Sequence, residues 1–407
     1  MKSSRLITFF LIMALISGCG GGGGGNDEFQ SGSASRASAV AGGDLHSCAL
    51  LSDNTIECWG KNSTGQLGNT IPSLSLSPVA VSGVTTATQV SGGGSHTCAI
   101  LSDGAINCWG DNSSGQLGNN SNTNSTTPVA VSGISDATAV SAGGNHTCAV
   151  LSGGTVECWG SNTSGQLGNN SQSNSSIPVS VSGITTAAAV SAGGNHTCAL
   201  LSDGTARCWG ANTLGQLGNS SITNSSVPVT VTNLADSTGI SAGSNHTCAV
   251  ISDGTVDCWG DNSSGQLGVL WTLISFFPTV NVTMSSTPVT AASSTITTAR
   301  AVAAGQAHSC ALLSDNKIRC WGDNSLGQLG NGGSTVGFAS PGSGASASTT
   351  IVPVLASGIS TALGLDSGLY HACARLTDSN VKCWGVNSSG QLGNGTGIAS
   401  STPVEVE

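Results

Sequence analysis

The sequence predicts an all-β fold, a seven-bladed β-propeller, from three observations. One unit occurs seven times: His-x-Cys, nine residues, Cys-Trp-Gly, and then Asn-x-x-Gly-Gln-Leu-Gly. Each copy has the pattern of a β-hairpin that is apolar on both faces, so each hairpin needs a covering sheet on either side. The two ends of the chain carry complementary parts of one repeat, as a closed ring requires.

The spacing of the copies locates two insertions. It is 50 residues four times, then 62 and 63, along the series His46, His96, His146, His196, His246, His308 and His371. We expect one array over residues 39–407, with repeats near 40–89, 90–139, 140–189, 190–239, 240–301, 302–364 and 365–407. The two longer spacings place the insertions within 269–287 and 332–349.

Each hairpin is predicted from a short turn between two strand-like runs. In the second copy, the runs 96–101 and 105–110 flank Ser102-Asp103-Gly104, which is typical of a type I turn followed by a left-handed glycine. The last turn position is Asn in two other copies and Ser379 in the seventh. Serine suits a left-handed backbone less well than glycine or asparagine.

The turn sets the strand register and so predicts how the cysteines pair. Pairing Leu101 with Ala105 brings Cys98 directly opposite Cys108, where Cβ atoms come within about 5 Å. An exported compartment would permit disulfides at such positions. We predict seven: Cys48–Cys58, Cys98–Cys108, Cys148–Cys158, Cys198–Cys208, Cys248–Cys258, Cys310–Cys320 and Cys373–Cys383.

Two further strands complete each repeat and suggest how the ring closes. In the second copy they are expected at 128–131, which contains a Pro-Val pair, and near 139–141. The chain ends on the equivalent Pro-Val strand at 403–406, whereas the first copy begins at Val40 with no such strand before it. We therefore expect the C-terminal strand to pair with the N-terminal strands, which leaves no exposed edge.

The fifteenth cysteine, Cys19, belongs to a leader-like segment. Lys2 and Arg5 precede an apolar run at 6–16, which is short for a membrane span and has the layout of a secretory leader. Ile16-Ser17-Gly18-Cys19 resembles a bacterial lipobox. This resemblance implies a signal peptide at 1–18, lipidation at Cys19, a flexible tether at 19–38 and, with glycine following, an outer-membrane location. An ordinary leader or a short anchor is the alternative.

The charge balance argues against nucleic-acid binding. Removing Lys2 and Arg5 with the leader leaves 8 of the 10 basic residues against 20 acidic ones. A duplex-binding protein needs a basic surface to displace counterions from the phosphates. The composition therefore favours no nucleic-acid partner, and a membrane contact through the lipid anchor alone.

The repeat as a whole resembles that of the regulator of chromosome condensation family. The resemblance rests on Gly-x-x-His-Thr-x-Ala-Leu, Asp-Gly and Cys-Trp-Gly-x-Asn-x-x-Gly-Gln-Leu-Gly, and it covers about residues 39–407. It implies the seven-bladed propeller. The namesake's action on a small GTPase at chromatin is not carried over, because this chain is acidic, has no basic tail and carries an export leader. A secreted β-lactamase inhibitor resembles the same propeller class.

Metal binding and catalysis are the alternatives to a structural role for the residues of the repeat. His-x-Cys with a facing Cys offers zinc ligands, but exported thiols should oxidise, which favours disulfides and a hydrogen-bonded histidine. The turn that begins at Asp111 resembles a calcium loop, but its first position is Lys61, Ser161 or Ala211 in other copies. Every histidine belongs to the repeat, and no catalytic set stands out. We therefore expect no enzyme activity and no cofactor.

The candidate binding residues lie in an insertion, where the sequence departs from the repeat. Trp271, Phe276 and Phe277 cluster in the first insertion, and such aromatic residues are frequent hot spots in protein interfaces. We expect a monomeric scaffold that binds a protein partner at the cell envelope. Packing of this loop on the ring is the structural alternative. A glycan-binding surface protein, or an extracytoplasmic enzyme or enzyme inhibitor, is the functional one.

Overall fold

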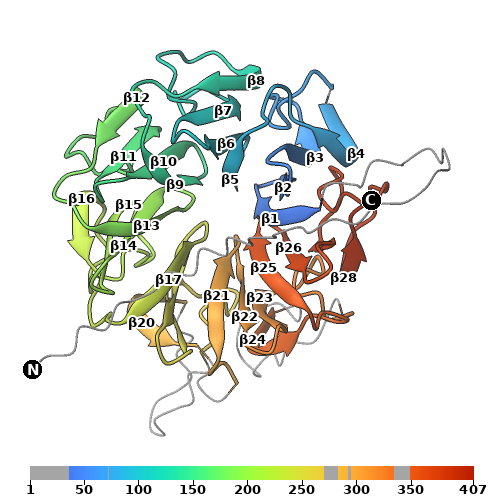
Figure 1. The fold of residues 1–407 in the computed structure, drawn as a ribbon. Coiled ribbons are helices and arrows are strands. Elements are labelled where there is room, and N and C mark those ends of the chain that lie inside the picture. Colours follow the sequence, from blue (N-terminus) through green and yellow to red (C-terminus); the bar gives the residue numbers. More distant parts are fainter. Residues whose placement is uncertain (1–35, 72, 270–282, 292–294, 334–348) are drawn as a thin grey trace, which may run out of the picture. The chain divides into compact units, whose positions relative to one another are not determined.

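The computed structural model describes residues 36–71, 73–269, 283–291, 295–333 and 349–407. The chain divides into two units, Met1–Ala34 and Ser35–Glu407, and the second contains all of the described residues. This unit is a ring of seven four-stranded sheets, so the predicted seven-bladed β-propeller is confirmed (Figure 1). None of the described residues belongs to a helix that is long and apolar enough to span a membrane.

The strands of each blade run in chain order from the centre of the ring to its rim (Figure 1). The first strands are β1 (Ala37–Gly42), β5 (Ala87–Gly92), β9 (Ala137–Ala142), β13 (Ala187–Ala192), β17 (Ser237–Ala242), β21 (Ala299–Ala304) and β25 (Ala362–Ser367). The second strands are β2 (His46–Leu51), β6 (His96–Leu101), β10 (His146–Leu151), β14 (His196–Leu201), β18 (His246–Ile251), β22 (His308–Leu313) and β26 (His371–Leu376).

The third and fourth strands complete the blades, which we number 1 (β1–β4) to 7 (β25–β28) along the chain. The third strands are β3 (Ile56–Asn62), β7 (Ile106–Gly110), β11 (Val156–Gly160), β15 (Ala206–Gly210), β19 (Val256–Asp261), β23 (Ile318–Asp323) and β27 (Val381–Gly385). The fourth strands are β4 (Ser73–Ala80), β8 (Ser125–Ala130), β12 (Ser175–Ser180), β16 (Ser225–Thr230), β20 (Met284–Thr290), β24 (Thr349–Leu355) and β28 (Ser400–Glu405).

The expected closure of the ring by pairing of its N- and C-terminal strands is wrong. β1 pairs with β2 across the short turn at 43–45, so the N-terminal strand stays in blade 1. β28 pairs with β27 and stays in blade 7. The strand expected near 139–141 as the last of the second repeat is β9, the first strand of blade 3. Blades 7 and 1 therefore meet face to face, as every other neighbouring pair does.

The hairpin register predicted from the turn is confirmed. In blade 2, Cys98 pairs with Cys108, and the Leu101 N–H donates to the Ala105 carbonyl at 2.9 Å. The last turn residue has a left-handed backbone even where it is not glycine, with φ of 69° at Ser379. The turn conformation is therefore kept in blade 7, in spite of a residue that suits it poorly.

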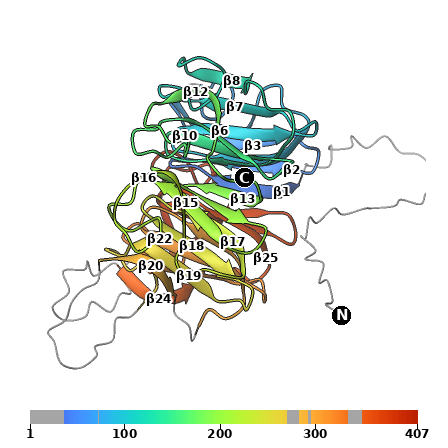
Figure 2. The same ribbon diagram turned by 90° about the vertical axis from the view of Figure 1, so that its left-hand side faces the viewer.

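Each core lies between two blades, because both faces of every sheet are covered. Between blades 1 and 2, Leu50 and Ile56 lie on the face of blade 1 that also carries the repeat histidine and cysteines. They pack against Ala99 and Trp109 on the opposite face of blade 2. Figure 2 shows β13–β16 beside β17–β20, which is one such pair of successive blades. Seven clusters of this kind, one for each junction, hold the ring together.

Candidate functional site

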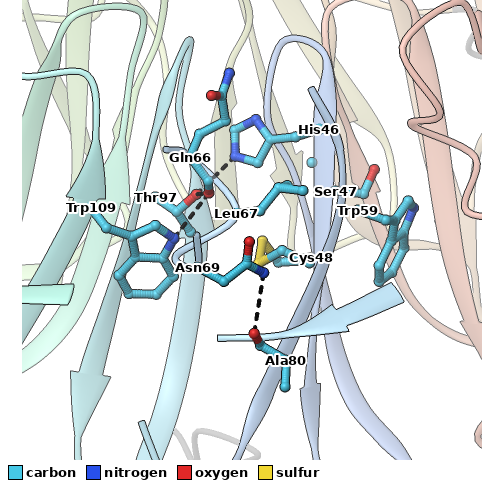
Figure 3. The surroundings of a disulfide bond; sticks show 12 residues. His46, Ser47, Cys48, Trp59, Gln66, Leu67, Asn69, Ala80, Thr97 and Trp109 are labelled. Atoms are coloured by element: carbon cyan, nitrogen blue, oxygen red, sulfur yellow. Dashed lines mark hydrogen bonds between the residues drawn. A yellow bond between two sulfur atoms is a disulfide. The ribbon is translucent and has the colours of Figure 1, made fainter. Parts of the chain in front are cut away.

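A chain of hydrogen bonds joins the histidine of one blade to the next blade (Figure 3). His46 Nε2 lies 2.8 Å from Thr97 Oγ1, and this hydroxyl donates to the Gln66 carbonyl oxygen, also at 2.8 Å. Trp109 Nε1 donates to the same carbonyl at 2.9 Å. His46 and Gln66 belong to blade 1, whereas Thr97 and Trp109 belong to blade 2. The four residues therefore form a clamp across the junction.

The clamp fixes the protonation of the histidine. A carbonyl oxygen can only accept, so the Thr97 hydroxyl uses its one hydrogen on Gln66 and must accept from His46. His46 Nε2 therefore carries the ring proton. Burial, with repulsion from neighbouring histidines, lowers the pKa of His46 to about 3. The ring is neutral at physiological pH.

The same arrangement repeats around the ring with one exception. A threonine or serine hydroxyl faces the histidine at six junctions: His46–Thr97, His96–Thr147, His146–Thr197, His196–Thr247, His246–Ser309 and His371–Ser47. The last of these closes the ring from blade 7 to blade 1. At the junction of blades 6 and 7, Ala372 stands in the hydroxyl position, and His308 Nε2 is buried with no hydrogen-bond partner among the described residues.

The cysteines and histidines do not converge on a metal. Each cysteine pair lies within one hairpin at disulfide distance, with Sγ atoms 2.05 to 2.11 Å apart. The predicted pairs are all disulfide-compatible. The nearby histidine directs Nε2 toward the next blade, and the described residues contain no group of three or more metal-ligating side chains. The residues that suggested zinc are therefore engaged elsewhere.

The Asn-x-x-Gly-Gln-Leu-Gly segment supports the clamp. In blade 2, Asn112 Oδ1 accepts from the Leu117 N–H at 2.9 Å, and Leu117 is fully buried. Gln116 supplies the carbonyl for Trp159 of blade 3. Gly118 has a φ of 68°, and a Cβ there would lie 2.8 Å from the Trp159 indole nitrogen, so only glycine fits. The motif is thus explained by packing.

The carboxylate of the calcium-like turn is also engaged. Asp111 Oδ2 accepts from Gln116 Nε2 at 2.6 Å and from Ser113 Oγ at 2.9 Å. The same two types of contact occur at Asp261 and Asp323. These carboxylates hold the glutamine whose carbonyl receives the tryptophan, which gives them a structural role.

One face of the ring carries two kinds of connection. The Lys61 N–H at the end of β3 donates to the Leu45 carbonyl at 2.9 Å, so third strands end beside the turns between first and second strands. We call this side the turn face: it holds the first–second turns, such as 43–45, and the third–fourth connections. The connection from β19 to β20 and that from β23 to β24 both begin and end on it, in neighbouring blades 5 and 6.

A central channel of about 130 Å³ is lined by the first strands and the turns that follow them. Most of its lining is glycine, including Gly43, Gly93 and Gly143. Asp44 is an exception, and burial raises the pKa of its carboxyl to about 6 against the opposing charge of Lys61.

A second carboxyl, Asp366, helps to seal the ring. Its Oδ2 accepts from the Gly42 N–H at 2.9 Å, across the junction of blades 7 and 1. Ser91 fills the equivalent position in blade 2, where its hydroxyl accepts from Ala142 N–H at 3.0 Å. Burial raises the pKa of Asp366 to about 6, although two N–H donors oppose that shift.

Several of the predicted site residues lie outside the described residues. They are the lipidation candidate Cys19 and the partner-binding candidates Trp271, Phe276 and Phe277. The residue after each histidine, which completes the clamp, was not among the predicted site residues. Threonine or serine occupies that position in six copies, and this regularity is visible in the sequence. The channel residue Asp44 could not be found in this way, because nothing in the repeat shows which turn positions line the channel.

The repeats match two sequence descriptions of one family, the regulator of chromosome condensation (RCC1) repeat. One matches residues 58–100, 103–150, 154–200 and 203–250. The other matches all seven copies, at 37–66, 87–116, 137–166, 187–216, 238–266, 299–328 and 364–391.

Solved RCC1-type structures have the same fold. Yeast RCC1 (Prp20) bound to Kap60 is 20% identical, with a TM-score of 0.75 over 87% of this chain and 83% of that one. Prp20p of Saccharomyces cerevisiae in a second structure has the same identity and TM-score over 92% and 87%. Human WBSCR16 is 21% identical, with a TM-score of 0.70 over 84% and 86%. This chain belongs to the RCC1 repeat family.

Proposed function

We propose that this protein is an exported, lipid-anchored scaffold whose propeller binds a protein partner through its turn face. One observation carries the proposal. The reactive side chains of the repeat are engaged at the blade junctions, as His46, Thr97 and Trp109 illustrate. The surface available for recognition is therefore where the blades differ, and the largest differences are the two insertions in blades 5 and 6.

Exposed apolar residues in blade 6 support this choice of face. Leu326 lies in the turn that follows β23, on the turn face, and is 45% exposed. Val352 on β24 is 42% exposed. Serine or threonine occupies the position of Leu326 in five of the seven blades. An apolar surface on blade 6, the neighbour of the blade whose sequence carries the Trp271 insertion, would give a protein partner a desolvated contact.

The relatives support a protein-binding scaffold but do not identify the partner of this chain. Yeast Prp20 has been solved bound to Kap60, and its binding to Gsp1p and histones has been described. Those partners belong to the yeast protein, which is 20% identical to this chain. What we carry over is the coarser property, a propeller that binds other proteins.

Export and lipidation account for the cysteines. Fourteen cysteines lie in disulfide-compatible pairs, and such pairs are typical of oxidising compartments. We expect mass spectrometry of the non-reduced protein to find all seven pairs oxidised. We expect Cys19→Ser to move the protein from the membrane fraction to the soluble one. Free thiols in all seven pairs would contradict export to an oxidising compartment. Unchanged fractionation of the Cys19→Ser variant would contradict lipidation.

The partner-binding claim is tested with two matched variants. The first replaces Trp271, Phe276 and Phe277 by serine. The control replaces Leu363 by serine, because this residue is 37% exposed and lies at the start of β25, away from the turn face. Full-length protein is immobilised and exposed to envelope proteins, and thermal unfolding of each variant is recorded.

We expect the aromatic variant to lose a specific captured protein while its unfolding midpoint stays within about 2 °C of the unmodified protein. We expect the Leu363→Ser control to retain capture. Equal capture by all three proteins would contradict the assignment of the turn face. A large fall in the midpoint of the aromatic variant would show instead that the insertion packs on the ring.

A further inference from the structure

One arginine occupies a core position that is apolar in the six other blades. Arg375 lies near the end of β26, on the same face of the strand as His371, which reaches Ser47 of blade 1 at 2.7 Å. The side chain of Arg375 therefore leaves blade 7 toward blade 1. Its equivalents are core residues that are 1–6% exposed: Leu50, Ile100, Val150, Leu200, Val250 and Leu312.

Arg375 lies on the side of the ring opposite to the turn face. Third strands end on the turn face, as the contact of the Lys61 N–H shows, so they begin on the other side. The turns between second and third strands therefore lie there, and we call this side the hairpin face. Arg375 is two residues before such a turn and pairs with Val381 directly after it. A site at Arg375 is thus separate from the proposed turn-face contact and does not depend on it.

The guanidinium of Arg375 has no counter-charge in the described part of the chain. The ion pair recorded there joins Lys317 to Asp315, and the Arg375 side chain makes no hydrogen bond with the described residues. Burial lowers the pKa of Arg375, and no neighbouring carboxylate opposes this shift. A partly buried charge without a partner destabilises a protein, whereas the six apolar equivalents have no such cost. The arginine therefore has an unused capacity to bind an anion.

A glycine leaves room for the arginine side chain. Gly364 pairs with Arg375 from the neighbouring strand β25, and a Cβ there would lie 3.9 Å from the arginine Nε. The side chain of Arg375 thus runs across backbone that carries no side chain of its own. Five of the six equivalents of Gly364 do carry one: Ala39, Gln89, Ala139, Ala189 and Ala301.

The junction of blades 7 and 1 also lacks a cover that the other junctions have on the hairpin face. At those six, the connection from a fourth strand to the next first strand places one apolar residue over the core. These residues are 0–6% exposed: Val84, Ile134, Ile184, Leu234, Ile296 and Ile359. Within the described residues, no such connection covers the junction of blades 7 and 1. Val406 is only partly buried there, whereas its equivalent Val81 is buried, so this end of the junction is accessible from the hairpin face.

The charge of the site selects the class of ligand. A guanidinium binds carboxylate and phosphate oxygens with paired N–H donors. No second cationic group acts on Arg375, so the site offers one positive charge. A carboxylate matches this charge, whereas a phosphate monoester carries about −1.5 to −2 and calls for further cations.

We propose that Arg375 binds a carboxylate group at the hairpin-face end of the junction of blades 7 and 1. A free organic acid and an acidic side chain of another protein present the same chemistry, and the experiment below separates them. A single guanidinium makes a weak site, with a Kd of about 1–10 mM for a small carboxylate.

The repeat supplies variants that should keep the fold. Blades 1, 4 and 6 have leucine where blade 7 has Arg375, so Arg375→Leu recreates a core that the protein already contains three times. Arg207→Asn is the matched control, because blade 2 has Asn107 at that position. It removes an arginine that already has a partner, since Arg207 donates to the Gly183 carbonyl at 3.3 Å.

The experiment follows the arginine Nε–H signals of full-length protein labelled with ¹⁵N-arginine. Sodium propionate is added at pH 7 and constant ionic strength, and the Arg375 signal is identified by its absence from Arg375→Leu. We expect this signal to shift saturably, while the Arg207 signal stays in place and 1-propanol, the uncharged counterpart, has no effect. The absence of a saturable shift up to about 50 mM propionate would overturn the proposal. So would an equal shift of the Arg207 signal.

The same titration with acetyl-Gly-Glu-Gly-amide separates the two sources of the carboxylate. A Kd at least tenfold below that of propionate assigns the site to an acidic segment of a protein. A similar Kd assigns it to a free organic acid, and either result supports the proposal. Acetyl-Gly-Gln-Gly-amide is the uncharged match. If it binds as tightly as the glutamate peptide, the carboxylate plays no part and the proposal fails.

Thermal unfolding gives an independent measurement. Propionate at about 50 mM should raise the midpoints of the unmodified protein and of Arg207→Asn by about 1–3 °C, relative to the same concentration of sodium chloride. It should leave the midpoint of Arg375→Leu unchanged. Without propionate, Arg375→Leu should unfold no earlier than the unmodified protein, because an apolar side chain replaces an unpaired charge. A clear fall would show that Arg375 already has a partner within the chain, which would overturn the proposal.

Discussion

Ala372→Ser should stabilise the ring, because it completes the one histidine clamp that the sequence leaves open. His308 Nε2 is fully buried and has no hydrogen-bond partner in the described part of the chain, and Ala372 occupies the position of the missing hydroxyl. Serine performs this role at two other junctions. Ser309 lies 2.8 Å from His246 and donates to the Gln266 carbonyl at 2.9 Å.

The magnitude follows from the two hydrogen bonds gained. Each contributes about 0.5–1.5 kcal/mol, and leaving a buried group such as His308 Nε2 without a partner costs about 1–3 kcal/mol. We therefore expect Ala372→Ser to raise the free energy of unfolding by about 1–3 kcal/mol. For a chain of this length, 1 kcal/mol shifts the thermal midpoint by roughly 1–2 °C. The midpoint should thus rise by a few degrees.

The assay is differential scanning calorimetry of the oxidised protein, with Ser309→Ala as the matched reverse change. That control leaves His246 Nε2 without a partner, so its midpoint should fall by a similar amount. The reasoning is refuted if Ala372→Ser lowers the midpoint or leaves it unchanged while Ser309→Ala lowers it. It is refuted as well if neither change has an effect.

Two other predictions rest on the same network. Within the described structure, Gln391 Nε2 is buried without a hydrogen-bond partner, whereas the equivalent Gln116 Nε2 in blade 2 donates to Asp111. Val386→Asp would supply the same acceptor, so it should raise the free energy of unfolding by about 1–2 kcal/mol, seen as a higher chemical-denaturation midpoint. Acid should destabilise the ring, because burial lowers all seven histidine pKa values to about 3–4 in the folded state, against 6.5 when unfolded. The folded state then binds fewer protons, so stability is complete above pH 6.5 and falls by about 2 kcal/mol per histidine at pH 5. Asp44 and Asp366 act in the opposite direction with a smaller total, and denaturation midpoints at pH 7.5 and 5 measure the net change.

The sequence was sufficient for the fold and the hairpins because their signals are local. The turn at 102–104 and the cysteine spacing independently indicate one register, and the structure has it. The boundary between one blade and the next was not predictable in the same way. A period of 50 residues shows that a ring repeats, but it does not show whether the strand at 137–142 belongs to the hairpin before it or after it. The short turn after that strand decides the matter.

The candidate site was harder to predict from the sequence than the fold, because its contacts join different blades. The residue after each histidine, such as Thr97, is polar in a strand with two apolar faces, and this is a signal that could have been used. The break at Ala372 is visible in the sequence as well. The channel is different, because its lining depends on which carbonyls of seven separate turns meet at the centre. Such a site depends on contacts between segments that are far apart in the chain.

The histidine, the hydroxyl and the tryptophan of the repeat hold neighbouring blades together, and this claim is the one most worth testing. Long-range ¹H–¹⁵N NMR spectra of the histidine rings, recorded from pH 8 to pH 6, test it most directly. We expect seven neutral rings that do not titrate in this range, with the proton on Nε2 in the six that face a hydroxyl. Rings that titrate near pH 6.5, or protons on Nδ1 in those six, would contradict the claim.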